Sequence, residues 1–371
     1  MDLEEAILQL FFQRFKMQVY ITSVSNISPQ PTFEQDSFPD ELVGQESKFL
    51  SCIEPDYRNF INPIQLRRMP RILKMALASS QCCINRSPVT NPDGIIVGTG
   101  LGCLENLEKF LLSIIEDNEH VLSVLPFINS THNAVAAQIA MLLKNHNYNI
   151  TYCHRGFSFE SALTDAMMLI GEKEANHVLV GGIDECTPNF VFLHDYLGYW
   201  KDAVNNLQLL RYKTPGTIAG EGSAFFMLSA QCTDGTYAKL DLVSTGFALE
   251  NKEEVMSQLD MLLQNAGLTR EDLDLVIFGM NGDIYFDKIY HQLQHSYFDS
   301  SSVYAYYKHL CGDYYTSTAF ALWLASIIIR NQSIPAVVRL NSANRQHIRH
   351  VLIYNHIRNK EHSMILVSEL E

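Results

Sequence analysis

The sequence predicts an α/β fold in which a βαβαβαββ unit occurs twice around mostly parallel sheets. Short apolar segments rich in Val and Ile alternate with helical patterns, which is typical of βαβ units. The apolar segments of the second part of the chain repeat those of the first part in the same order. Hydrophobic residues make up 47% of the 371 residues, which is enough for a large buried core and argues against long disorder.

Five segments in the first part of the chain are predicted to be strands. Each is short, is rich in apolar and β-branched residues, and is bounded by glycine or polar turn residues. The predicted strands are VYITSVSNI (19–27), GIIVGTG (94–100), NITYC (149–153), HVLVGGI (177–183) and SAFFMLSA (223–230).

A turn at CTDGTY (232–237) precedes a second set of predicted strands. Segments of this set resemble segments of the first: MQVYITSVSNI resembles AKLDLVSTGFA, and ANHVLVGGID resembles IRHVLIYNHI. We therefore predict two halves of one compact unit, 17–231 and 232–371, after an N-terminal extension at 1–16 that reads as a short amphipathic helix. The predicted strands are KLDLVSTGFAL (239–249), DLVIFGM (274–280), SSVYAYY (301–307), AVVRLN (336–341), HVLIYNHI (350–357) and SMILVSE (363–369).

Composition excludes several classes of protein. The formal net charge of −14 argues against nucleic-acid binding and suits a soluble cytoplasmic protein. The eight cysteines form no C-x-x-C pair and no H-E-x-x-H motif is present, so we predict reduced thiols and no metal. The apolar run at 316–329 is too short to span a bilayer. GTGLG (98–102) lacks the G-x-G-x-x-G spacing of a dinucleotide site, and no cofactor is expected.

The stretch TYCHRGFSFE (151–160) carries the first candidate for catalysis. Cys153 and His154 precede a predicted helix N-terminus, where a thiol can be activated. Adjacent residues of a strand point to opposite faces, however, so a buried, inert cysteine is the competing interpretation. Arg155 and Glu160 flank the turn as a possible structural ion pair, and capping by Ser158 is the alternative that the sequence leaves open.

Several motifs together resemble the β-ketoacyl synthase family, which has the thiolase fold. The most specific is PGTIAGEGSAFFML (215–228), and VLVGGIDE (178–185), AGLTREDLDLVIFG (266–279), INPIQLRRMPRILKMALASS (61–80) and PFINSTHNAVAAQIAMLLKNHNYNITY (126–152) agree with it. The resemblance covers nearly the whole chain from Met17. It implies two duplicated halves in a five-layer αβαβα sandwich.

The positions that carry catalysis in that family depart from its pattern. The resemblance implies a nucleophilic cysteine at a strand–helix elbow and two histidines, and here these positions fall on Gly156, Phe278 and Asp313. Lys308 of the family's lysine–glycine–histidine motif is retained, and NHIRNKEHS (355–363) replaces its glycine-rich gating loop. Glycine supplies no nucleophile, phenylalanine cannot donate to an oxyanion, and aspartate adds negative charge where negative charge would develop.

The resemblance therefore implies a non-catalytic subunit of the chain-length-factor type. Such a subunit pairs with an active ketosynthase paralogue, serves an acyl carrier protein, and shapes the tunnel of the growing chain. The residues predicted to line the tunnel or the interface are Thr131, His132, Asn133, Phe157 and Phe159. A satisfied buried histidine is the alternative for His132.

A basic cluster on the helix at 61–80 is a candidate docking site for an acidic carrier protein. It consists of Arg67, Arg68 and Arg71, with a solvated helix face as the alternative. Two other functions stay open at this point. One is an active condensing enzyme that uses Cys153, and the other is a stand-alone scaffold or small-ligand binder, for which a homodimer is possible.

Overall fold

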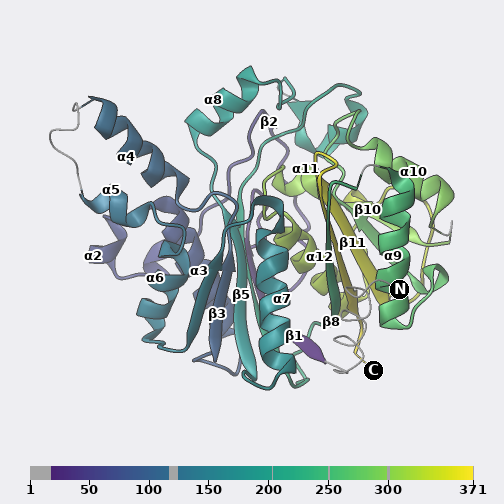
Figure 1. Cartoon of the computed structure of the whole chain (residues 1–371), viewed down its shortest axis with the longest axis horizontal. Helices are drawn as coiled ribbons and strands as arrows, with labels where there is room; N and C mark the ends of the chain where they lie inside the picture. The colour runs from purple at the N-terminus through teal and green to yellow at the C-terminus, as the bar shows by residue number, and fades with distance from the viewer. Residues whose placement is uncertain (1–17, 117–123, 203, 250, 299–300, 371) are drawn as a thin grey trace.

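The computed structural model describes residues 18–116, 124–202, 204–249, 251–298 and 301–370. The helix expected at 1–16 lies outside these ranges. Within them, ten strands form one sheet in the order β10-β9-β11-β12-β8-β1-β7-β5-β3-β4, and helices cover both of its faces (Figure 1).

Five neighbouring strands of the large sheet, β1, β7, β5, β3 and β4, come from the first half of the chain. β1 pairs antiparallel with β7 and β7 with β5, whereas β5, β3 and β4 run parallel. The strands are β1 (Val19–Ile27), β3 (Gly94–Gly98), β4 (Tyr148–Tyr152), β5 (His177–Asp184) and β7 (Gly222–Ser229).

The second half repeats this arrangement strand for strand. β8 pairs antiparallel with β12 and β12 with β11, whereas β11, β9 and β10 run parallel. The predicted duplication is therefore confirmed, and β1 and β8 join the two halves through an antiparallel pairing that includes Val19 and Leu240. The strands are β8 (Ala238–Phe247), β9 (Leu275–Phe278), β10 (Val303–Tyr306), β11 (His350–Ile357) and β12 (Glu361–Ser368).

Three helical layers and the two halves of the sheet make the predicted five-layer sandwich. Helices α7 (Ser158–Gly171) and α12 (Thr318–Asn331) form the middle layer, and α12 contacts β1 and β7 of one half and β11 and β12 of the other. Side chains alternate along the strands: Ile96 of β3 faces this middle layer, whereas Ile95 and Val97 face the outer helices of the first half. Those outer helices are α3 (Arg71–Asn85) and α6 (Ala134–Leu143), and those of the second half are α9 (Lys252–Ala266) and α10 (Lys288–Ser296).

Shorter elements surround this sandwich. Helices α4 (Leu104–Glu116) and α5 (Val124–Asn129) extend from one end of the molecule, and α8 (Pro188–Tyr196) lies over the carboxyl end of β5 (Figure 1). Apart from five 3₁₀ helices among the described residues, the remaining elements are α2 (Pro63–Leu66), α11 (Lys308–Cys311), β2 (Glu46–Ser47) and β6 (Val204–Asn205), the last two forming a small separate sheet.

Two sequence-based expectations about elements differ from the structure. The strand predicted at 336–341 is wrong: Ala336–Val338 forms a 3₁₀ turn after Pro335, and Arg339 makes an isolated bridge to Ala305. The helix expected at 61–80 is divided, because Pro70 separates α2 from α3. Both differences arise at a proline, Pro335 in the first case and Pro70 in the second.

No helix within the described ranges combines the length and the apolar character that crossing a membrane requires.

Candidate functional site

The elbow between β4 and α7 has no nucleophilic side chain. Gly156 occupies it, and its backbone N–H donates to Glu361 Oε2 at 2.9 Å. A Cβ at Gly156 would lie 2.5 Å from Glu361 Oε2 and 2.7 Å from Ile357 Cγ1, so the opposing hairpin fills the space that a larger side chain needs. The backbone N–H at this helix start could donate to a thioester oxygen, but it is already paired with Glu361.

Cys153 lies three residues before the elbow glycine. Its side chain is exposed, and the thiol lies 3.4 Å from the carbonyl oxygen of Gly100. Partial burial and the nearby Asp184 carboxylate raise the pKa of the Cys153 thiol. The neighbouring His154 ring faces Phe157, with ring centroids 5.5 Å apart. Nothing in these contacts favours the thiolate form that a nucleophile requires.

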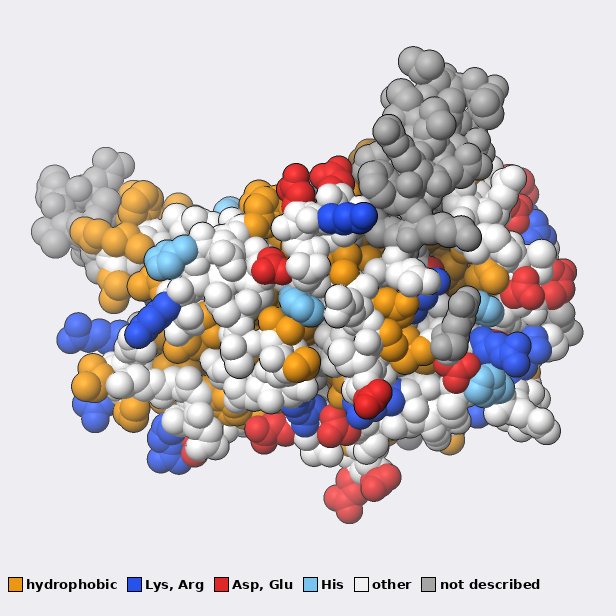
Figure 2. Space-filling view, turned by 90° about the horizontal axis from the view of Figure 1, so that it is seen from below, with side chains coloured by type: hydrophobic (Ala, Val, Ile, Leu, Met, Phe, Trp, Pro, Cys, Tyr) orange, Lys and Arg blue, Asp and Glu red, His pale blue; other side chains and the backbone are white. Residues whose placement is uncertain are grey.

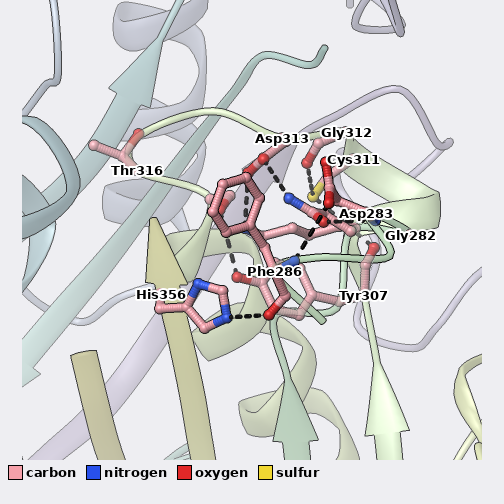
Figure 3. A network of polar contacts seen from close by, with 12 residues as sticks. Gly282, Asp283, Phe286, Tyr307, Cys311, Gly312, Asp313, Thr316 and His356 are labelled. Carbon is pink, nitrogen blue, oxygen red and sulfur yellow. Dashed lines mark hydrogen bonds and ion pairs between the residues drawn. The ribbon is translucent and has the colours of Figure 1, made fainter. Parts of the chain in front are cut away.

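The position predicted to replace the second histidine carries a buried ion pair. Lys308 Nζ lies 2.7 Å from Asp313 Oδ1, and Asn281 Nδ2 donates to Asp313 Oδ2 at 2.8 Å (Figure 3). The Lys308 side chain is fully buried. The ammonium group thus neutralises the carboxylate, and the pair fixes α11 against the turn that follows β9.

Phe278 lies away from this ion pair. Its side chain is fully buried in the outer core of the second half, where its ring packs on Tyr290 and Tyr304. The residue of the following turn that faces the site is Asn281, and the Asp287 carboxylate holds this turn by accepting from the backbone N–H groups of Asn281 and Gly282. Burial raises the pKa of Asp287 to about 7. Phe278, which the sequence comparison assigned to the place of the first histidine, is therefore a core residue at the end of β9.

A tight hairpin between β11 and β12 stands where a glycine-rich gating loop was expected. Three residues, 358–360, connect the two strands, and the first two of them, Arg358 and Asn359, have positive φ. Asn359 N–H donates to His356 Nδ1. His356 Nε2 lies 3.1 Å from the carbonyl oxygen of Phe286 (Figure 3). Burial lowers the pKa of His356 well below its ordinary value, so this histidine is a neutral brace inside the hairpin.

Two buried carboxylates tie the site to the rest of the fold. Asp184 at the end of β5 accepts from Gly100 N–H and from the backbone and side chain of Thr316 at 2.7 to 2.9 Å, which joins the two halves. Glu221 of the GEGSA motif accepts from Arg71 Nη1 and Nη2, each at 2.6 Å. The motif that is most specific for the family therefore has a structural role here.

The predicted docking cluster is divided by this pairing. Arg71 is bound to Glu221 and to Glu54, so its guanidinium is not available to a partner. Arg67 and Arg68 are exposed on the segment before α3. Two of the three predicted arginines thus remain as surface charges.

The predicted tunnel residues lie in two environments. Thr131, His132 and Asn133 are exposed at the start of α6, so the satisfied buried histidine considered for His132 does not apply. Phe157 is nearly buried below His154. Phe159 is fully buried with its ring centroid 5.7 Å from that of Phe226, so the core and not a tunnel contains it.

Two alternatives were considered for the residues that flank the elbow, an Arg155–Glu160 ion pair and capping of the helix by Ser158, and the structure shows neither in that form. Glu160 makes no ion pair with Arg155; its carboxylate is fully buried. Burial raises the pKa of Glu160 to about 7. Ser158 accepts from His154 N–H at 2.8 Å and donates to the carbonyl oxygen of Arg155 at 2.7 Å, so it orders the turn from inside the first helical position.

A cavity of about 380 Å³ opens beside the Lys308–Asp313 pair. The sequence did not point to it, although the aromatic density of FVFLHDYLGYW (190–200) is a signal that was present. Much of its wall consists of aromatic side chains, and it also receives the carboxylates of Asp184, Glu185, Asp283 and Asp313 and the guanidinium of Arg358. The aromatic lining residues are Phe190, His194, Tyr199, Trp200, Tyr285, Phe286, Tyr314 and Tyr315.

The elbow and the position opposite it carry a glycine and an ion-paired aspartate. No side chain at the elbow can accept an acyl group, and the opposing position carries a neutralised carboxylate. Across the described part of the chain, no group of three or more His, Cys, Asp or Glu side chains is placed to hold a metal ion.

Comparison with known proteins gives a family match over part of the chain. Residues 45–199 match the family model of the beta-ketoacyl synthase N-terminal domain. No curated protein matches the sequence. This match covers part of the N-terminal half and agrees with the family that the motifs resemble.

Solved structures share the fold along almost the entire chain. The structure of the ishigamide ketosynthase/chain length factor has a TM-score of 0.78 at 14% identity, covering 96% of this chain and 100% of the other. A ketosynthase (ApeO) in complex with its chain length factor (ApeC) from Xenorhabdus doucetiae gives 0.73 at 13%, with 95% and 98% covered. A type II polyketide synthase acyl-carrier protein in complex with its ketosynthase (AntDE:AntF) gives 0.75 at 13%, with 95% and 100% covered. The chain thus resembles, in its fold, the proteins of ketosynthase–chain length factor assemblies.

Proposed function

We propose that this chain is a non-catalytic ketosynthase-like subunit of the chain-length-factor type. It pairs with an active ketosynthase, shapes the tunnel that holds the growing acyl or polyene chain, and works beside an acyl carrier protein. The observation that carries this proposal is the elbow, where Gly156 offers no nucleophile and its N–H is already bound to Glu361. The acyl group would be carried by the cysteine of the partner.

The edge of the sheet supports the pairing. β4 is the terminal strand of the first half, and Tyr148 and Ile150 on it are 39% and 36% exposed. Apolar side chains of α5 and α6 extend the same end of the molecule, with Phe127, Ile128 and Met141 between 53% and 69% exposed. Figure 2 shows apolar side chains gathered at the left of its view. Free strand edges and apolar patches of this kind are features that a partner subunit covers.

Covalent labelling tests the loss of catalysis. The isolated chain is incubated with an acyl carrier thioester or with cerulenin, and its intact mass is measured. We expect no adduct, because the Cys153 thiol is held in its protonated form and the elbow is filled. An acyl adduct that the Cys153→Ser variant abolishes, while the Cys186→Ser variant retains it, would show that the chain is an active condensing enzyme.

Co-expression with an intact ketosynthase tests the pairing. We expect a stable heterodimer whose product length changes when this subunit is altered. The Ile150→Lys variant should lose the partner, because a charge at the strand edge cannot be desolvated there. Met261→Lys is the matched control, since Met261 of α9 is 40% exposed on the outer layer of the other half. A homodimer that ignores the ketosynthase would favour a stand-alone scaffold instead.

A further inference from the structure

The cavity beside Asp313 has the walls of a ligand site for flat molecules. Its volume of about 380 Å³ lies at the lower end of the roughly 300–1,000 Å³ that small-molecule sites occupy. The Phe190 and His194 rings, the Trp200 indole and the Phe286 ring reach it from three separate segments of the chain. Aromatic walls stack with planar, conjugated groups better than with flexible saturated ones.

The four carboxylates that reach the cavity are already engaged within the protein. Asp313 is paired with Lys308, and Asp184 accepts four hydrogen bonds from Gly100, Thr99 and Thr316. The backbone N–H groups of Gly216, Tyr285 and Phe286 donate to Asp283, and that of Glu105 donates to Glu185. These groups shape the cavity floor and leave little demand for a cationic ligand.

Arg358, the cationic residue that lines the cavity, has no such partner among the described residues. The guanidinium carbon of Arg358, an exposed residue, lies 4.0 Å from the centroid of the Tyr199 ring and 5.1 Å from that of Phe286, which keeps it at the cavity. No described carboxylate lies within ion-pair distance of it, and no described residue accepts a hydrogen bond from its side chain. The tight hairpin fixes its backbone. A guanidinium positioned in this way offers a planar pair of donors to a carboxylate or phosphate.

We propose that this cavity binds a planar conjugated acid, whose anionic group pairs with Arg358 while its flat body stacks among the aromatic side chains. The ligand is held without covalent change. The site goes beyond the proposed function, because it is formed by this chain alone and needs neither a ketosynthase partner nor a catalytic cysteine.

Titration of the full-length chain with trans-cinnamate tests this site. Trp200 lines the cavity, so its fluorescence reports occupancy, and calorimetry gives the affinity independently. Cinnamyl alcohol has the same flat body without the charge. We expect cinnamate to bind more tightly than the alcohol, and the Arg358→Gln variant to weaken cinnamate by about tenfold while leaving the alcohol unchanged.

Two further variants separate the site from general effects of charge or folding. Arg330→Gln is the matched control, because Arg330 also stacks on a ring, that of Tyr237 at 4.1 Å, but does not line the cavity. It should bind cinnamate like the wild type. Arg358→Lys keeps the charge without the planar fork and should give an intermediate affinity. Near-ultraviolet circular dichroism confirms that each variant is folded.

Three results would overturn the proposal. One is equal affinity of cinnamate for the wild type and the Arg358→Gln variant, and another is the same loss in the Arg330→Gln variant. The third is binding of phosphopantetheine without any binding of cinnamate, which would assign the anion to a carrier arm and not to a planar acid. None of these bears on the elbow or on the pairing, so the proposed function is tested separately.

Discussion

At the scale of single residues, the site is a set of charges that neutralise one another. From the sequence alone, the negative charge of Asp313 looked unfavourable at this position. Sequence spacing does not show which side chain lies opposite it. The structure supplies the answer in Lys308, five residues earlier on the same turn. Both residues stand out in the sequence, but only the structure shows that they form an ion pair with each other.

The Asp313→Asn variant should be less stable by about 3 kcal/mol in urea unfolding, since it leaves the fully buried Lys308 ammonium without an anion. Adding Lys308→Met should recover much of this loss, because the double variant has no unpaired charge. Asp195→Asn, which breaks the exposed Lys48–Asp195 pair, should change little. Equal effects at the two ion pairs would contradict the role of burial.

Other residue-level predictions had a different outcome because side-chain direction within an element is hard to infer from spacing. Gly156 lies at the elbow, as the helix alignment predicted. Phe278 on β9 and Phe159 on α7 both point into the core. On a strand such as β9, a shift of one residue turns the side chain to the other face. Arg358 was not singled out, since its importance depends on rings from distant segments.

At the scale of elements, the strands were predictable and the turns were not. The apolar segments give all ten strands of the large sheet, because buried parallel strands appear as continuous apolar runs. The segment at 336–341 has the same composition but follows Pro335 and forms a 3₁₀ turn. The hairpin at Arg358 and Asn359 was expected as a replaced loop, while its tightness depends on positive φ angles that no residue type there demands.

The packing of α7 against α12 and β12 predicts a pH dependence of stability. Glu160 of α7 is fully buried, and burial raises the pKa of its carboxyl from 4.5 to about 7. Between these values the folded chain holds a proton that the unfolded chain has released. The free energy of unfolding should therefore fall as pH rises from about 4.5 to 7, by about 3 kcal/mol from this group, and stay level above.

Urea unfolding of the Glu160→Gln variant at several pH values checks this contribution. The variant should lack that part of the slope and exceed the wild type in stability at pH 8, because a neutral amide replaces a buried charge. Glu253→Gln, at an exposed position in the first turn of α9, should keep the wild-type slope. Parallel curves for the wild type and the Glu160→Gln variant would mean that the carboxyl does not titrate in this range.

At the scale of the whole molecule, the two halves depend on each other for a core. Helix α12 of the second half packs on β1 and β7 of the first, and α7 of the first half packs on β8 of the second. Asp184 and Thr316 connect the halves beside the site, and Gly220 N–H donates to the carbonyl oxygen of Asp313. A Cβ at Gly220 would lie 2.0 Å from the carbonyl oxygen of Cys311, so no larger residue fits at this close approach.

This mutual packing predicts that both halves unfold in one transition. The chain has two tryptophans, Trp200 in the first half and Trp323 in α12 of the second, and each can report its own half. We expect the native ¹⁹F resonances of 5-fluorotryptophan at both positions to disappear at the same urea concentration, because neither half retains a closed core alone. Trp200→Phe and Trp323→Phe variants serve to assign the two resonances. Loss of the Trp200 signal well before that of Trp323 would show that the first half opens independently, and the site between the halves would then be a separable interface.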